Sequence, residues 1–138
     1  MALLETRGLS KSFGGLKAVS GVDLKVQPGT VHGLIGPNGS GKSTFFNLVT
    51  GVYQPDPGSH IEFDGHDITN LQAHGIAALG MARTFQLLRL FSEMTVLENV
   101  MVGNHCKTRY GIVESLLGTS RVRQADQQMK EEMLDLLE

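Results

Sequence analysis

The sequence has 138 residues, of which 41% are hydrophobic and 19% charged, and its formal net charge is −2 at pH 7. This length is about one domain, and the charge balance excludes a polybasic surface for nucleic acid or anionic lipid. No apolar run approaches the ~20 residues that span a bilayer, and the single cysteine, Cys106, cannot form an internal disulfide. We therefore expect a globular protein in a cytoplasmic, reducing location.

The first thirty residues contain two runs that are typical of strands. Residues 3–9 form the first, and residues 18–26 alternate apolar and polar side chains as a half-buried strand does. Residues 10–15 predict a loop with Phe13 at its centre, and residues 27–30 (Gln-Pro-Gly-Thr) predict a turn. We expect the chain to begin with strands.

A phosphate-binding pattern follows this turn. Residues 36–44 fit G-x-x-x-x-G-K-[ST], which requires a strand before it and a helix after it. Residues 31–35 (Val-His-Gly-Leu-Ile) predict that strand, and residues 44–49 predict a helix that begins near Ser43. The alternative is a glycine-rich turn with a chance lysine, and the apolar run in the required place argues against it.

The chemistry of this loop is that of phosphate recognition. Its glycines let successive backbone N–H groups converge on the phosphates, and the positive end of the helix dipole points the same way. We expect Lys42 to lie near the β- and γ-phosphates, Ser43 to offer a hydroxyl to Mg²⁺, and Thr44 to reach the α-phosphate. The candidate phosphate-binding residues are Gly36, Pro37, Asn38, Gly39, Ser40, Gly41, Lys42, Ser43 and Thr44.

Turn signals dominate the region after the first helix. Residues 54–58 (Gln-Pro-Asp-Pro-Gly) cannot continue a helix, and residues 61–65 predict a hairpin with a primed turn at Asp-Gly. Thr69 or Asn70 is expected to cap a short helix over residues 71–77. Aspartate is a common turn residue because its side chain hydrogen-bonds the nearby backbone. The turns therefore account for the aspartates of this region, and we assign them no catalytic role.

The last part of the sequence predicts helices. Thr95 and Glu98 have the spacing of a capping box, which indicates the start of a helix. Residues 103–120 are polar and contain glycine, which is typical of a connection. From Arg121 onward, apolar residues recur at helical spacing to the last residue.

Together, these residues resemble the ATP-binding subunits of ABC transporters, over nearly the whole chain and as the N-terminal half of such a subunit. Residues 36–44 look like the Walker A loop of the family. The resemblance implies that Phe13 stacks on adenine and that Val19 lies beside the base and ribose. Taken alone, an aromatic ring in a loop flanked by glycine is also compatible with packing on the sheet. Thr84-Phe85-Gln86 looks like the Q-loop, which implies that Gln86 coordinates Mg²⁺ or the attacking water.

The resemblance also implies a fold and its division. We expect an α/β chain with a partial P-loop NTPase core, an N-terminal antiparallel β subdomain and the start of a helical subdomain. The expected β subdomain comprises residues 1–30 and 59–68. The P-loop core would run over residues 31–58 and 69–91, and residues 92–138 would begin the helical subdomain.

Residues 81–100 narrow the resemblance to the ATPases of branched-chain amino-acid uptake systems, with urea and short-amide systems as similar alternatives. The implied partners are transmembrane permease subunits, a second ATPase subunit, and a periplasmic or extracellular solute-binding protein indirectly. No nucleic acid is implied. The implied location of the protein is the inner face of the cell membrane, to which the permease subunits attach it.

The sequence contains no Leu-Ser-Gly-Gly-Gln signature, no Walker B acid and no later switch histidine. We therefore expect the N-terminal part of an ATPase whose 138 residues alone do not hydrolyse ATP. Because an open parallel sheet edge invites self-association, we expect these residues alone to be poorly stable or to form oligomers. A non-catalytic nucleotide-binding fragment is the alternative. A P-loop kinase or GTPase is a further alternative, but no Asn-Lys-x-Asp for guanine is present.

Overall fold

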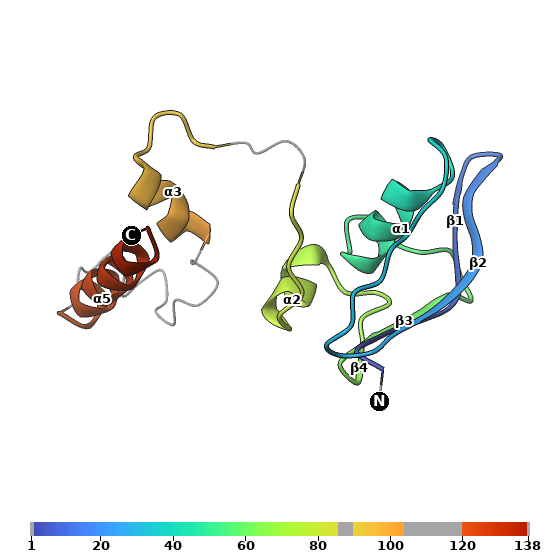
Figure 1. The fold of residues 1–138 in the computed structure, drawn as a ribbon, viewed down its shortest axis with the longest axis horizontal. Coiled ribbons are helices and arrows are strands. Elements are labelled where there is room, and N and C mark those ends of the chain that lie inside the picture. Colours follow the sequence, from blue (N-terminus) through green and yellow to red (C-terminus); the bar gives the residue numbers. More distant parts are fainter. Residues whose placement is uncertain (1, 86–89, 104–119, 138) are drawn as a thin grey trace. The chain divides into compact units, whose positions relative to one another are not determined.

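The computed structural model of the protein describes residues 2–85, 90–103 and 120–137. The chain divides into two compact units, Met1–Thr84 and Phe85–Glu138 (Figure 1). The first unit contains the sheet and the phosphate-binding loop, and the second contains helices. The predicted three-part division into subdomains stays a prediction.

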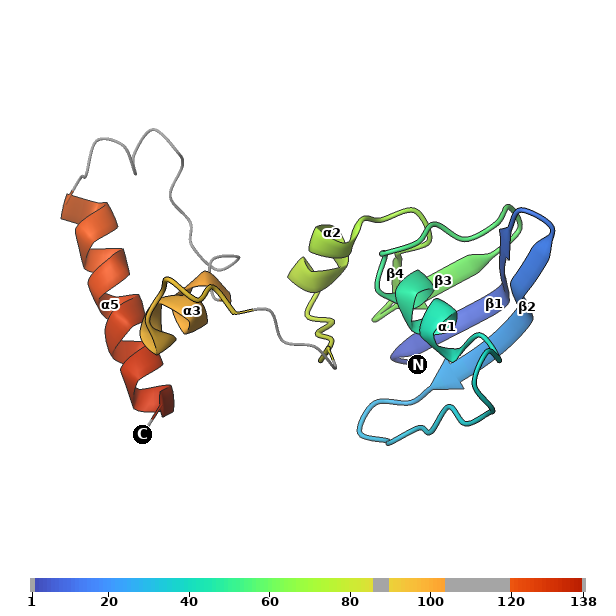
Figure 2. The same ribbon diagram turned by 90° about the horizontal axis from the view of Figure 1, so that it is seen from above.

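A four-stranded antiparallel sheet with strand order β2-β1-β3-β4 forms the framework of the first unit (Figure 2). Strands β1 (Leu4–Phe13) and β2 (Leu16–Val26) form a long hairpin. Strands β3 (His60–Phe63) and β4 (His66–Asp67) form a short one. Because β1 pairs with both β2 and β3, it lies in the interior of the sheet.

The long hairpin extends further than the sequence predicts. Residues 10–13 belong to β1, so the expectation of a loop over residues 10–15 is wrong, and only Gly14 and Gly15 form the turn. The cause is pairing with β2, in which Lys11, Ser12 and Phe13 lie opposite Val19, Lys17 and Leu16. Ser10 is held by more distant residues: its backbone N–H donates to Ser59 Oγ at 3.0 Å, and its carbonyl accepts from the Asp56 N–H at 2.9 Å.

The short hairpin has the predicted primed turn. Asp64 and Gly65 connect β3 to β4, and both have positive φ angles, 47° and 76°. Positive φ at both central residues defines a type I′ turn, whose twist matches that of the flanking strands. The two turn residues are sufficient to specify this turn, and the prediction is confirmed.

Helices α1 (Lys42–Val49) and α2 (Ala73–Ala78) pack apolar side chains into the core of the first unit. The predicted cap of α2 is wrong. The N-cap is Gln72, with no side-chain capping bond. Thr69 instead donates its hydroxyl to Asp67 Oδ1 at 2.6 Å and accepts from the Ile61 N–H at 2.9 Å, which joins β3 to the chain after β4. The buried core consists of Leu9, Val19, Phe45, Leu48, Val49, Ile61, Ile68 and Ile76.

The predicted strand over residues 31–35 is not formed. This segment has no regular secondary structure, and Val31 and Ile35 are 101% and 92% exposed. A strand requires a hydrogen-bonded neighbour, and none of the strands among the described residues pairs with this segment. The apolar pattern therefore predicts the wrong local structure here.

The second unit contains α3 (Val96–Gly103) and α5 (Ser120–Leu137), which contact each other. The predicted capping box is confirmed. The Thr95 N–H donates to Glu98 Oε2 at 2.7 Å, and the Glu98 N–H donates back to Thr95 Oγ1 at 3.3 Å. The final helix is confirmed as well, whereas most of the predicted connection lies outside the described residues.

Within the described residues, no helix combines the length and the apolar character that crossing a membrane would require.

Candidate nucleotide-binding site

The phosphate-binding loop lies between the irregular residues 31–35 and the first residue of α1. Gly39 and Gly41 have φ angles of 82° and 89°, in the left-handed region that favours glycine. At Gly41 the packing is equally restrictive, because an added Cβ would overlap the carbonyl oxygen of Ala18 on β2. The glycine at position 41 is therefore required both by its φ angle and by the close approach of β2.

Three buried side chains fix α1 on the sheet. Phe45, Leu48 and Val49 are 6%, 1% and 4% exposed and belong to the core. The helix starts with a hydrogen bond from the Phe45 N–H to the Gly41 carbonyl, 2.8 Å long. The first N–H groups of a helix have no intrahelical acceptor, and they carry the positive end of the helix dipole. The core thus holds an anion-attracting helix end directly behind the loop.

Lys42 folds back over the loop. Its ammonium donates to the carbonyl oxygens of Gly36 at 2.6 Å and Pro37 at 2.7 Å, and it lies 3.5 Å from Ser40 Oγ. An ammonium has three N–H donors and no acceptor. The arrangement therefore keeps a positive charge at the loop, where it can exchange carbonyl partners for phosphate oxygens.

The two hydroxyl residues after Lys42 differ in exposure. Ser43 is exposed on the first turn of α1, and Thr44 is half-buried beside it. Magnesium is bound mainly by oxygen ligands and keeps several waters, so one accessible hydroxyl next to a phosphate site fits this ion. Among the described residues, no cluster of three or more histidine, cysteine or carboxylate side chains could hold a metal on its own. The assignment of Mg²⁺ to Ser43 stays a prediction.

Phe13 is the last residue of β1 and is 43% exposed. Its ring makes an edge contact with Tyr53, with ring centroids 5.3 Å apart and an interplanar angle of 75°. The ammonium of Lys11 lies over the ring, 5.5 Å from its centroid. Sequence reasoning missed both neighbours. Lys11 and Phe13 share a face of β1 because they are two residues apart on a strand, but the sequence predicted a loop there, and no sequence signal identifies Tyr53.

Val19 is a core residue beneath the loop. It is 6% exposed, and a Cβ added at Gly41 would come within 3.4 Å of Val19 Cγ2. The structure thus brings Val19 together with the phosphate loop. Contact between Val19 and a base stays a prediction, as does stacking on Phe13.

Gln86, the predicted Q-loop residue, lies outside the described residues. The residue three positions before it is described. Arg83 Nη1 donates to Asn47 Oδ1 at 2.7 Å and to Thr50 Oγ1 at 3.2 Å, so it is bound to the C-terminal end of α1. The sequence analysis gave this arginine no role.

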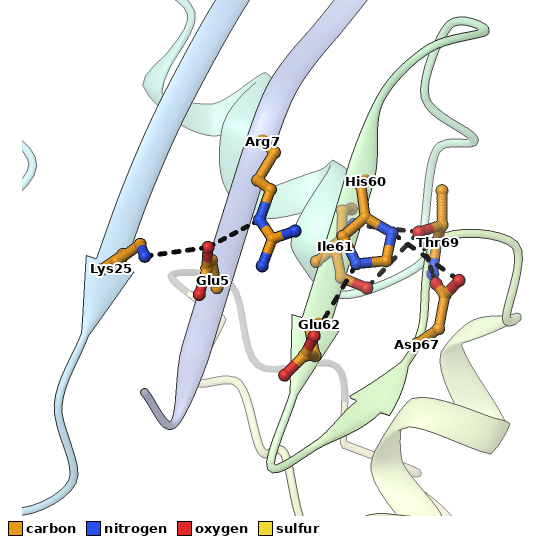
Figure 3. A network of polar contacts seen from close by, with 8 residues as sticks. All are labelled: Glu5, Arg7, Lys25, His60, Ile61, Glu62, Asp67 and Thr69. Atoms are coloured by element: carbon orange, nitrogen blue, oxygen red, sulfur yellow. Dashed lines mark hydrogen bonds and ion pairs between the residues drawn. The ribbon is translucent and has the colours of Figure 1, made fainter. Parts of the chain in front are cut away.

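The first unit has a network of charges on the sheet (Figure 3). Glu5 accepts from Arg7 Nε at 2.7 Å and lies 3.2 Å from Lys25 Nζ, and these two cations, Arg7 first, lower the pKa of its carboxyl. The hydroxyl and then the backbone N–H of Thr69 lower the pKa of Asp67. Glu5 and Arg7 flank the buried Thr6 on β1, so they lie on the opposite face from the core. Their contacts are not part of the phosphate site.

Comparison with known families and proteins gives consistent results. The family model described as "ABC transporter" matches residues 19–137. The chain is 46% identical over 129 residues to the high-affinity branched-chain amino acid transport ATP-binding protein BraF of Pseudomonas aeruginosa, covering 94% of this chain and 50% of that protein. It is 46% identical over 123 residues to the corresponding protein LivG of Escherichia coli K12, covering 89% of this chain and 48% of LivG. The chain spans about half the length of the curated relatives it matches.

Solved structures confirm the fold. The ADP conformation of the ATP-binding cassette MJ1267 matches with a TM-score of 0.69 and 40% identity, covering 87% of this chain and 46% of that one. A dimeric post-hydrolysis state of the cassette MJ0796, bound to ADP and Pi, matches with a TM-score of 0.68 over 96% of this chain and 54% of that one. At 21% identity, the second match shows the fold alone. The predicted class, a partial P-loop NTPase fold with an antiparallel sheet and helices, is confirmed.

Proposed function

Because this chain belongs to the ABC transporter family, we propose that it binds ATP and Mg²⁺ and that the whole protein couples ATP binding and hydrolysis to the import of a solute. The observation that carries this proposal is the loop geometry. Gly39 and Gly41 adopt left-handed conformations, and Lys42 stands at the start of a helix that Phe45, Leu48 and Val49 anchor in the core. This arrangement favours a polyphosphate.

Each residue of the site has a specific role in this proposal. The loop N–H groups and Lys42 bind the phosphates, and Lys42 exchanges its carbonyl partners on Gly36 and Pro37 for phosphate oxygens. The Ser43 hydroxyl holds Mg²⁺, which bridges phosphate oxygens and neutralises charge that develops during phosphoryl transfer. Phe13 supplies an exposed ring for adenine, with Val19 below the loop. Gln86 positions the ion or the attacking water.

Loss of the Lys42 charge tests the nucleotide site. In isothermal titration with Mg-ATP, Lys42→Ala should weaken binding by about 10- to 150-fold, the range expected for losing a hydrogen bond to a charged group. Lys130→Ala is the matched control, because Lys130 is an exposed lysine on α5 in the other unit. Equal affinities of the parent chain and Lys42→Ala would refute the proposed site.

Steady-state ATPase measurements separate two forms of the proposal. Turnover that Lys42→Ala abolishes supports a working ATPase in the chain as given. Binding without turnover supports a nucleotide-binding fragment that needs further parts of the protein and a second ATPase subunit for hydrolysis. We favour the second result for these 138 residues, because the sequence lacks an acid at the end of an apolar strand that could activate water.

The relatives named for branched-chain amino acid transport support that class of solute, and urea or short amides remain the alternative. Uptake by the assembled transporter in proteoliposomes distinguishes them. We expect ATP-dependent entry of labelled leucine, isoleucine and valine, and no competition by urea or acetamide. Competition by an amide and not by leucine would reassign the solute.

A groove in the second unit supports a membrane partner. Exposed apolar side chains follow Gln86 closely in the sequence, with Leu90, Phe91 and Val96 being 72%, 55% and 68% exposed. Together with Ser92, Met94, Asn99 and Val100 they line a groove of about 360 Å³. Exposed apolar surface of this kind marks an interaction site. We assign it to a permease subunit at the inner face of the membrane, in a transporter that also receives solute from a solute-binding protein.

Co-purification tests this contact. Val96→Ser should reduce recovery of the ATP-binding protein with tagged permease subunits, because it removes apolar area from the groove. Leu134→Ser is the control, since Leu134 is 45% exposed on α5 and does not line the groove. Equal recovery of both variants would contradict the assignment of the groove.

A further inference from the structure

Two side chains hold the exposed ring of Phe13. Tyr53 makes an edge contact with it, with the ring centroids 5.3 Å apart, and the ammonium of Lys11 lies 5.5 Å from its centroid. Edge contacts between rings and cations over a ring are both stabilised by the ring quadrupole. The Phe13 ring is nevertheless 43% exposed, so these contacts leave part of it accessible to a ligand.

Both neighbours are fixed by hydrogen bonds within the first unit. The Tyr53 N–H donates to the carbonyl of Asn47 on α1 at 3.0 Å. The Lys11 ammonium donates to the carbonyl of Gln54, the residue after Tyr53, at 2.7 Å, and it lies 3.9 Å from Asp56 Oδ1. Lys11 thus ties the distal part of β1 to the segment that carries the second ring.

The ring cluster of Phe13, Tyr53 and Lys11 has the same supports as the phosphate-binding loop. On the long hairpin, Lys11 lies opposite Val19, whose side chain is packed under the last glycine of the loop. Helix α1 begins directly after that glycine, and its Asn47 carbonyl holds Tyr53. One strand pair and one helix therefore position both the loop and the ring cluster.

A side chain that is already held in one orientation binds a ligand more tightly than a mobile one. An exposed phenylalanine ring can occupy several rotamers, and fixing one of them on binding costs conformational entropy. The contacts from Tyr53 and Lys11 restrict the Phe13 ring before any ligand arrives. The ring is thereby ordered when the first unit folds and not when a base binds.

We propose that Tyr53 and Lys11 are positioning residues that hold the Phe13 ring in the orientation in which a base stacks on it. This inference rests on the proposed nucleotide function, and within it on stacking of the base on Phe13. Neither residue needs to touch the nucleotide. Their substitution should therefore weaken the binding of ligands that contain a base and leave the binding of phosphate groups alone unchanged.

Isothermal titration with Mg-ATP and with inorganic triphosphate separates these effects. Tyr53→Leu should weaken ATP binding by about 2- to 12-fold, the range expected for losing one aromatic pair. The affinity for triphosphate should not change, because that ligand has no base. Tyr53→Phe keeps the ring and should retain the ATP affinity of the parent. Phe46→Leu is the matched control and should leave ATP affinity unchanged, since it removes a 47% exposed ring whose edge contact is with Phe45.

Variants of Lys11 test the second contact. Lys11→Met removes the ammonium and keeps an unbranched side chain, and it should weaken ATP binding by about 2- to 5-fold without affecting triphosphate. Lys11→Arg keeps a cation and should retain most of the ATP affinity. Lys17→Met is the matched control, because Lys17 is an exposed lysine on β2 of the same hairpin.

A double-mutant cycle shows whether Tyr53 acts through the ring of Phe13. In the Phe13→Ala background, Tyr53→Leu should cause no further loss of ATP affinity, because no ring remains to be positioned. An equal loss in both backgrounds would mean that Tyr53 acts independently of the ring, and it would overturn the proposal.

The other outcomes are equally decisive. Unchanged ATP affinity in Tyr53→Leu and Lys11→Met overturns the proposal. Losses of equal size for ATP and triphosphate, with lowered urea midpoints, show a purely structural role and overturn it as well. A parent chain that binds neither ligand refutes the proposed function itself, and unchanged ATP affinity in Phe13→Ala refutes base stacking; either result also removes the basis of the positioning role. Weakened ATP binding with unchanged triphosphate binding, and no such effect in the Phe13→Ala background, supports it.

Discussion

The backbone of Gly41 lies so close to the carbonyl oxygen of Ala18 that no side chain can be accommodated between them. This approach joins the phosphate loop to β2 near the turn of the long hairpin. Val19, the next residue on β2, is buried under the same glycine. The sheet thereby determines where the loop and the start of α1 lie.

Gly41→Ala should destabilise the first unit and weaken ATP binding together. The substitution combines a φ angle of 89° with overlap on Ala18, and we expect a loss of about 2–4 kcal/mol of unfolding free energy. Gly39→Ala is the matched control. Its φ angle is 82°, but nothing lies within 4 Å of an added Cβ, so only the backbone strain of about 1–2 kcal/mol applies. Urea denaturation distinguishes the two. Equal losses would show that the approach to Ala18 is not restrictive.

Phe13→Ala should weaken ATP binding by about 5- to 150-fold, the range for losing a base stacked on an aromatic ring. Binding of inorganic triphosphate should be unchanged, because that ligand has no base. Phe13→Tyr should retain ATP affinity, since the ring is kept. Isothermal titration with both ligands is the measurement. If both ligands lose affinity to the same degree in Phe13→Ala, the ring acts on the loop and does not stack on adenine.

Glu98 should make the second unit sensitive to acid. Its carboxylate accepts from the backbone N–H and then the hydroxyl of Thr95, and these bonds lower the pKa of Glu98 below its ordinary value. The contribution of the Glu98 carboxylate to the stability of the second unit is therefore complete above about pH 4.3, the ordinary pKa of glutamate. It is lost as the pH falls through the lowered pKa of Glu98. Far-ultraviolet circular dichroism should show helix loss on acidification. Glu98→Gln should reduce this pH dependence, because its amide oxygen accepts at every pH; an unchanged acid transition would contradict this assignment.

Leu48→Ala should cost about 2–5 kcal/mol of unfolding free energy, because Leu48 is 1% exposed and its truncation leaves a cavity under α1. Since Leu48 fixes the helix behind the phosphate loop, ATP affinity should also fall. Leu16→Ala is the control, with a side chain 69% exposed at the start of β2, and it should change stability by less than about 0.5 kcal/mol. Chemical denaturation measures both. A loss at Leu16 as large as that at Leu48 would place the core elsewhere.

Features that depend on neighbouring residues were predictable from the sequence. The Asp64-Gly65 turn follows from the ease with which these residues adopt positive φ. The capping box follows from the spacing of Thr95 and Glu98, whose side chains reach each other's N–H groups. The helix at Lys42 follows from the glycine-rich loop before it.

Features that depend on distant residues were not predictable. Residues 10–13 have the polar composition of a loop, yet pairing with β2 and the bonds from Ser10 to Asp56 and Ser59 hold them in β1. Residues 31–35 have the apolar composition of a strand, yet no strand of the described residues pairs with them. Tyr53 and Arg83 carry no motif, and only the fold brings them to Phe13 and Asn47.

The sequence by itself determined that the chain carries a phosphate-binding loop of the ABC family, because that loop works through backbone conformations which its own glycines specify. The tertiary structure alone decided how the loop is held. Gly41 lies against Ala18, Leu48 lies in the core, and Arg83 binds Asn47 across 36 residues of sequence. Burial and hydrogen bonding select such pairs only once the sheet has formed.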